Sequence, residues 1–279
     1  MNRTDFEALG DRHKAYEARE TMHRLMPGLP VLVRLDGRSF HTFTRGLERP
    51  FDTRLRQAMV ETAKYLVGET HASVGYTQSD EISLAFPNTN PDNQVVFDGR
   101  LQKMCSVLAS MATAKFNQQV RELLPEKAHL LPVFDARVYQ YPTLALAAES
   151  FLWRETDATR NSLIMAAHAF YSHKELHKVS TAGKHELLRA KGINWADYPA
   201  AHKRGVYVRR ESVLKEFTPA ELARIPVNRR PTGPVMRSMV RELDMAPLTQ
   251  VANVNGVLFF GEAPLGFAPE VAQEESVLG

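Results

Sequence analysis

Apolar and polar positions over residues 31–86 predict a strand, a helix and two more strands. Residues 31–35 form a short apolar run typical of a buried strand, which ends in Asp36 and then a glycine that predicts an exposed, flexible turn. Apolar side chains recur at helical spacing from about residue 50 to residue 68. Residues 73–86 alternate as two paired strands do, with a polar turn between them.

A second helix and a fourth strand follow. Residues 99–117 carry a strong helical stripe, and residues 133–139 predict a strand. Prolines at 132 and 142 suit an edge strand, because proline donates no hydrogen bond to a neighbouring strand. The order strand, helix, strand, strand, helix, strand predicts an α+β, ferredoxin-like (βαββαβ) fold. In this fold the first strand lies between the fourth and the third and is antiparallel to the third.

The rest of the chain divides into a lead-in, a helical region and a tail. Residues 1–30 read as an exposed helical lead-in, so we take 1–140 as the first domain. We expect residues 141–215 to be a mostly helical, basic region packed on it, and 216–279 to be a small C-terminal extension. In that extension we predict a helix over 234–243 and a hairpin at Asn255-Gly256.

Composition restricts the class of protein without naming a function. Hydrophobic residues make up 44% and charged residues 24%, and no apolar run is long enough to cross a membrane. Cys105 is the only cysteine, which excludes an intramolecular disulfide and suits a reducing compartment, and the polar N-terminus does not read as a signal peptide. We therefore expect a cytoplasmic protein with no membrane partner. The net charge of +3 permits a phosphate-rich partner but does not require one.

The topology predicts that two aspartates meet. The end of the first strand abuts the start of the third, so Asp36 and Asp80 should lie together at one sheet edge. Neighbouring carboxylates repel unless one is protonated or both bind a cation, and hard oxygen ligands suit Mg²⁺. The Gly37 carbonyl could be a further ligand, which favours phosphoryl or nucleotidyl transfer with two divalent ions. The alternative is that both aspartates only cap turns.

Four ordered motifs resemble the tRNA-His guanylyltransferase family over about residues 5–215. They are Arg-Leu-Asp-Gly-Arg-Ser-Phe-His-x-Phe at 34–43, Gly-Tyr-Thr-Gln-Ser-Asp-Glu at 75–81, Phe-Asp-Ala-Arg-Val at 134–138 and Trp-Arg-x-x-Asp at 153–157. The resemblance implies a polymerase-palm catalytic domain that adds nucleotides in the 3′-to-5′ direction. In that family the tRNA 5′ end is activated with ATP or carries a triphosphate, and the 3′-hydroxyl of GTP attacks it. Members are commonly tetrameric.

The resemblance also implies roles for individual residues. Asp36, the Gly37 carbonyl and Asp80 would hold two Mg²⁺ ions, with Ser79 and Glu81 supporting them. The implied nucleotide contacts are Arg34, Gly37, Arg38, Ser39, Phe40, His41, Ser79 and Lys103; the implied RNA or phosphate contacts are Arg49, Arg137, Asn161 and Lys184. Each cation could equally be a solvated surface residue, and we favour Arg38, Lys103 and Lys184. The rings of Phe40 and Phe43 could stack on a base, although an aromatic beside a strand is more often core.

One departure from the family affects the expected substrate. Eukaryotic members carry His-Ile-Asn-Asn-Leu-Tyr-Asn where this chain has Thr-Arg-Asn-Ser-Leu-Ile-Met at 159–165, so only Asn161 and Leu163 match. This points to the bacterial-type branch, whose members favour templated addition and repair of 5′-truncated tRNAs. Two other classes remain open: a palm-fold nucleotide cyclase or other small-nucleotide enzyme, and a non-catalytic RNA-binding module. The sequence does not decide the preferred tRNA, the need for a template or the need for ATP.

Overall fold

The computed structural model describes residues 3–89 and 95–267, and these residues form one antiparallel sheet. The strands lie in the order β4-β1-β3-β2-β5-β6. Their bounds are β1 Val31–Gly37, β2 Val74–Gln78, β3 Glu81–Phe86, β4 Phe134–Gln140, β5 Val206–Lys215 and β6 Val235–Glu242. The first four strands have the order predicted for a ferredoxin-like fold, and β4 is an edge strand as predicted.

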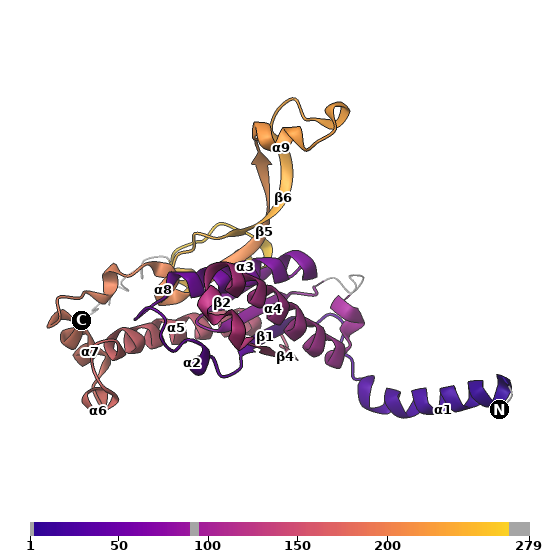
Figure 1. Cartoon of the computed structure of the whole chain (residues 1–279), viewed down its shortest axis with the longest axis horizontal. Coiled ribbons are helices and arrows are strands. Elements are labelled where there is room, and N and C mark those ends of the chain that lie inside the picture. Colours follow the sequence, from indigo (N-terminus) through magenta and orange to yellow (C-terminus); the bar gives the residue numbers. More distant parts are fainter. Residues whose placement is uncertain (1–2, 90–94, 268–279) are drawn as a thin grey trace, which may run out of the picture.

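Helices cover both faces of the sheet. Helices α3 (Thr53–Thr70) and α4 (Leu101–Leu123) pack on the face to which Val33 and Leu35 contribute fully buried side chains (Figure 1). Helix α5 (Leu144–His168) packs on the other face, where Leu32 lies. The alternation along β1 therefore places Arg34 and Asp36 on the α5 face.

The remaining elements are peripheral. The lead-in is helix α1 (Arg3–Thr21), which projects away from the body (Figure 1). The short helices are α2 Phe40–Phe43, α6 His173–Leu176, α7 Thr181–Arg189, α8 Ala200–Arg204 and α9 Pro219–Ala223. Single helical turns lie at η1 Val96–Gly99, η2 Pro125–Leu130, η3 Trp195–Asp197, η4 Val227–Arg229, η5 Leu248–Gln250 and η6 Gly256–Phe260. In the described part of the chain, no helix is both long and apolar enough to span a bilayer.

Both predictions for the tail are wrong. The segment predicted as a helix over 234–243 is strand β6, which pairs with β5 from Val208 opposite Glu242 to Lys215 opposite Val235. The predicted hairpin at Asn255-Gly256 is instead the π-helical turn η6. Val257, Leu258 and Phe259 are all buried in succession, which a helical turn against α5 allows and an alternating strand does not.

The sheet also crosses the boundary expected near residue 215. Strand β5 pairs with β2 through residues 206–208 and with β6 along the rest of its length. Together β5 and β6 form a ribbon that extends away from the helices and carries α9 beyond its end (Figure 1). Residues on both sides of position 215 therefore belong to one ribbon.

Candidate active site

The two predicted acids lie at the same edge of the sheet. Strands β1 and β3 are antiparallel, with Leu35 opposite Ile82 and Asp36 opposite Glu81. The Gly37 N–H donates a hydrogen bond to the Asp80 carbonyl at 3.0 Å, which closes the edge just beyond the paired residues. The end of β1 therefore meets the turn that carries Asp80, for the topological reason given by the sequence.

Charged residues form two rows across the strands. In the first row Asp36 lies between Asp135 on β4 and Glu81 on β3. In the second row, two residues along, Arg34 lies between Arg137 and Ser83. Directly opposed residues of antiparallel strands point to the same face, and two residues span about 7 Å. The row of three acidic residues thus lies two residues along the strands from the row that contains Arg34 and Arg137, and both rows are on the α5 face.

The electrostatics of Asp80 favour a bound cation. Burial raises the pKa of Asp80, the Ser79 side chain lowers it by hydrogen bonding, and the charge of Asp36 raises it further. The raised pKa means that keeping Asp36 and Asp80 both ionised costs free energy when no cation lies between them. No group of three or more His, Cys, Asp or Glu side chains within 3–89 and 95–267 is arranged to hold a metal. The donors fit Mg²⁺, which takes one or two protein carboxylates and leaves positions for water and phosphate oxygens.

Asp36 is only loosely compensated by protein cations. Arg137 lies between two acids, with Nη2 at 3.7 Å from Asp36 Oδ2 and Nε at 3.5 Å from Asp135 Oδ1. The Arg137 side chain is 52% exposed, so these contacts are weak and can exchange. The Nε–H of Arg34, two residues before Asp36 on β1, is buried and has no hydrogen-bond partner among the described residues.

Glu81 is held by an ion pair with α5. Arg154 Nε and Nη2 donate to the two Glu81 oxygens at 2.8 and 2.5 Å, and both side chains are nearly buried, at 12% and 8% exposed. Burial raises the pKa of Glu81, although the hydrogen bonds and charge of Arg154 act to lower it. Both carboxylate oxygens of Glu81 are therefore engaged, and its position suits a supporting role.

Gly37 is packed against the core, whereas the sequence predicted an exposed, flexible turn at this position. Gly37 is buried and is the last residue of β1, paired with Phe134. The Phe40 ring packs against Phe43, Phe116 and Phe134 with centroid separations of 5.2 to 5.4 Å. Phe40 and Phe43 are 3% and 4% exposed, so their rings belong to the core, which is the alternative that the sequence favoured over base stacking.

Two serines beside the acids adopt the left-handed region. Ser39 has φ 57° and Ser79 has φ 49°, and serine rarely adopts such values. The surrounding hydrogen bonds, including Arg38 N–H to the Val133 carbonyl at 2.9 Å, hold these turns in place. Strained backbone next to both acids is typical of a functional site.

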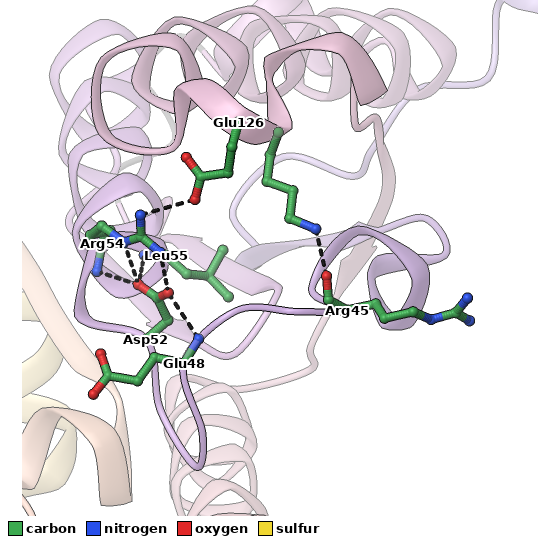
Figure 2. Close-up of polar contacts among 7 residues, drawn as sticks. Arg45, Glu48, Asp52, Arg54, Leu55 and Glu126 are labelled. Carbon is green, nitrogen blue, oxygen red and sulfur yellow. Dashed lines mark hydrogen bonds and ion pairs between the residues drawn. The ribbon is translucent and has the colours of Figure 1, made fainter.

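The loop that follows α2 is fixed at the same edge of the sheet. Asp52 caps α3 by accepting hydrogen bonds from the Arg54 and Leu55 amides at 2.9 and 3.4 Å, and its other oxygen accepts from the Glu48 amide at 3.2 Å (Figure 2). Arg54 also pairs with Glu126 at 2.9 Å (Figure 2). The exposed Arg49 therefore projects from a loop that is anchored at its end.

The structure separates the remaining predicted contacts into two groups. Arg38, Ser39 and His41 are exposed beside the Asp36 turn. Lys103 lies in the first turn of α4, on the helix layer of the opposite face, with Nζ 5.6 Å from the Phe97 ring centre. Leu101 N–H bonds the His23 carbonyl there, so this end of α4 lies near the start of β1 and away from Asp36.

Two predicted contacts are engaged within the chain. The Lys184 ammonium donates to the Val179 carbonyl. Asn161 donates to Asp157 at 3.1 Å, and Asp157 also lies 3.7 Å from Arg154. Asn161 is thus linked through α5 to Glu81.

The sequence reasoning assigned no role to Arg154 or Asp135. Both residues lie inside motifs that carried the family resemblance: Arg154 in Trp-Arg-x-x-Asp and Asp135 in Phe-Asp-Ala-Arg-Val. The motifs were therefore the available signal, but the partners of these residues lie 73 and 99 positions away along the chain.

A ferredoxin-like sheet with two acids at one strand edge defines a palm-type catalytic domain. Two solved structures described as bacterial tRNA(His) guanylyltransferase (Thg1)-like proteins are similar to this chain. The one in complex with ATP has a TM-score of 0.68 and 42% identity, covering 73% of this chain and 87% of that one. The one in complex with GTP has a TM-score of 0.67 and 35% identity, covering 87% and 94%.

Sequence comparison agrees. The profile of the family described as "Thg1: tRNAHis guanylyltransferase" matches residues 10–142. The tRNA(His) guanylyltransferase of Schizosaccharomyces pombe is 28% identical over 212 residues, covering 71% of this chain and 80% of the relative. The chain belongs to the tRNA(His) guanylyltransferase family, a family of nucleotidyltransferases, and its structural neighbours include the bacterial-type branch.

Proposed function

We propose that this protein is a Mg²⁺-dependent 3′-to-5′ nucleotidyltransferase that adds nucleotides, with GTP favoured, to the 5′ end of tRNA. The observation that carries the proposal is the meeting of Asp36 and Asp80 at one sheet edge, beside the arginine row. The neighbours solved with ATP and with GTP support nucleotide substrates.

In this proposal the acidic residues hold the metal and the arginines bind phosphate. Asp36, Asp80 and the Gly37 carbonyl would hold the metal, which neutralises phosphate charge and favours the attacking hydroxyl when it is bound. Arg34, with its free buried Nε, and the exposed Arg137 would bind phosphate oxygens through charge-assisted hydrogen bonds. Glu81 supports this edge through its ion pair.

The proposed reaction joins the incoming nucleotide to the 5′ end of the tRNA. The 3′-hydroxyl of the incoming nucleotide attacks the phosphorus at the tRNA 5′ end and forms a new phosphodiester bond. The bond to the leaving group breaks, releasing pyrophosphate from a 5′-triphosphate or AMP from a 5′ end activated with ATP. Two exposed cations, Arg38 beside the Asp36 turn and Arg49 in the loop before α3, would contact the RNA backbone.

We further propose 5′-end repair, alongside or in place of tRNA-His maturation. Residues 159–165 depart from the eukaryotic motif, and the neighbours with the higher identities are bacterial Thg1-like proteins. We also propose a cytoplasmic homotetramer, on the basis of the single cysteine and of the family resemblance.

An extension assay tests this proposal. Labelled GTP is incubated with intact tRNA-His and with 5′-truncated tRNAs of other identities, using the wild type, Asp36→Asn and Asp80→Asn. We expect RNA-dependent, metal-dependent labelling of truncated tRNAs by the wild type, and a loss of at least a hundredfold in either variant. Glu186→Gln, an exposed acid on α7, is the matched control.

Other outcomes point to the other classes. Strong preference for intact tRNA-His would replace repair by maturation. A cyclic nucleotide formed without RNA would favour a cyclase. Tight tRNA binding with no turnover would favour a non-catalytic RNA-binding module, and full activity of Asp80→Asn would remove the metal assignment.

A further inference from the structure

Glu81 is placed where a third metal ligand would be expected. It directly follows Asp80 in the chain, and it lies opposite Asp36 on the neighbouring strand. Directly opposed residues of antiparallel strands have Cβ atoms about 5 Å apart, so the Glu81 carboxylate lies within reach of the same cation.

Arg154 engages both oxygens of Glu81. The two hydrogen bonds, at 2.8 and 2.5 Å, form a fork on the carboxylate, and the pair is nearly buried. A buried ion pair gains little net stability, because the desolvation of both charges offsets their attraction. The presence of this ion pair is therefore not explained by a gain in folding stability.

The guanidinium group is itself fixed on α5. Its carbon lies 4.8 Å from the centre of the Trp153 ring, and Nη1 lies 3.7 Å from Asp157. Asp157 also accepts hydrogen bonds from Arg160 and Asn161 on the next turn of the helix. Arg154 is thus held in the orientation that faces Glu81.

We propose that Arg154 is a positioning residue that withholds Glu81 from the metal site, so that only Asp36 and Asp80 supply protein carboxylates to the divalent ion. This inference rests on the proposed function, since it concerns the same metal site. Its consequence is chemical: with two carboxylates the ion keeps positions for substrate phosphates, whereas a third carboxylate would occupy one of them and hold the ion more tightly.

The test measures Mn²⁺ binding in the absence of nucleotide, by electron paramagnetic resonance, in the full-length protein. Arg154→Met frees Glu81, and we expect Mn²⁺ to bind about tenfold more tightly while kcat for nucleotide addition falls. The double variant Glu81→Gln/Arg154→Met removes the freed charge and should return Mn²⁺ affinity to within about twofold of wild type, with kcat partly restored. A merely structural role of Arg154 predicts unchanged or weaker Mn²⁺ binding in Arg154→Met, because partial recovery of kcat by Glu81→Gln would also follow from removing an unpaired buried charge.

Two further variants keep the test decisive. Arg154→Lys retains the charge but offers a single point of contact, so it should tighten Mn²⁺ binding a few-fold even if Arg154→Met does not fold. Arg189→Met, which removes an exposed cation on α7 outside this network, is the matched control and should leave the affinity unchanged.

The outcomes separate this inference from the proposed function. Unchanged or weaker Mn²⁺ binding in Arg154→Met and Arg154→Lys, with binding abolished by Asp80→Asn, overturns the role of Arg154 and leaves the metal site standing. A wild type that binds no Mn²⁺, or an Asp80→Asn variant that binds it normally, overturns both.

Discussion

The Phe40 ring lies over the backbone of Gly37, so a Cβ atom at position 37 would overlap with three atoms of the ring. The glycine at the end of β1 is therefore required by packing, and its φ is not in the left-handed region. The aromatic cluster below it holds the Asp36 turn against the core. This contact connects core packing directly with the geometry of the proposed metal site.

Gly37→Ala should lower both stability and activity. An added methyl group displaces a tightly packed ring, which costs about 1–3 kcal/mol of unfolding free energy. Urea unfolding followed by circular dichroism measures this loss, and Gly37→Ala/Phe40→Leu should recover part of it. Gly233→Ala is the control, because it lies outside the helices and strands and no described atom beyond its chain neighbours lies within 4 Å of the added group. Equal stability of Gly37→Ala and wild type would contradict the packing argument.

Arg34→Met should weaken binding of the triphosphate. Its buried Nε has no hydrogen-bond partner among residues 3–89 and 95–267, and a hydrogen bond to a charged group contributes about 1.5–3 kcal/mol. We expect the KM for GTP to rise about ten- to hundredfold, with a smaller change in kcat. Steady-state kinetics at saturating tRNA measure this, with the exposed Arg121→Met on α4 as control. An unchanged KM would exclude Arg34 from the phosphate contacts.

Asp52→Ala should remove the cap of α3 and the anchor of the loop before it. Loss of a helix cap costs about 1–2 kcal/mol of unfolding free energy, and Asp52→Asn should lose less because asparagine also caps. Chemical denaturation at pH 7 measures both differences.

The stability that Asp52 contributes to the folded state should depend on pH. Burial acts to raise the pKa of Asp52, but the Arg54 side chain and the Glu48 and Arg54 amides lower it below its usual 3.8. A depressed pKa contributes stability that is present above 3.8 and is lost as the pH falls through the folded-state value. The gap between wild type and Asp52→Ala should therefore narrow below about pH 4; a gap independent of pH would contradict this.

The stability of the Glu155→Gln variant relative to wild type should increase as the pH rises. Glu155 is 3% exposed, and burial raises its pKa above 4.5. A hydrogen bond that Glu155 accepts from the Leu248 N–H at 2.9 Å and the charge of Arg204 act to lower this pKa but do not offset the burial. The folded state holds the proton more tightly, so stability falls as the pH rises from 4.5 through the folded pKa.

Thermal unfolding at several pH values tests this prediction. Relative to wild type, Glu155→Gln should gain stability between pH 4 and pH 8, because glutamine keeps the contact without the charge. Glu155→Ala is the control, since it loses the Leu248 contact at every pH. A constant difference between wild type and Glu155→Gln would show that Glu155 does not titrate differently on folding.

The order of the inner strands could be predicted from the sequence because periodicity and chain connectivity determine it. Apolar runs and helical stripes over residues 31–139 mark the βαββαβ order, and antiparallel pairing then requires the end of β1 to meet the start of β3. That constraint alone brought Asp36 to the turn carrying Asp80.

Features that depend on partners far along the chain could not be predicted. Residues 234–243 fit a helix or a strand by local pattern, and only pairing with β5 makes them a strand. The pattern around Phe40 favoured a core position but left base stacking open, and packing of its ring with Phe116 and Phe134 places it in the core.

The sequence by itself thus determined which acids meet, because a strand order fixes which ends are neighbours. Only the tertiary structure decided which charges around them are free. The Arg154–Glu81 pair depends on how α5 lies across the sheet, and Arg137 reaches Asp36 because β4 pairs with β1. Such contacts arise from the packing of separate elements, which local spacing does not encode.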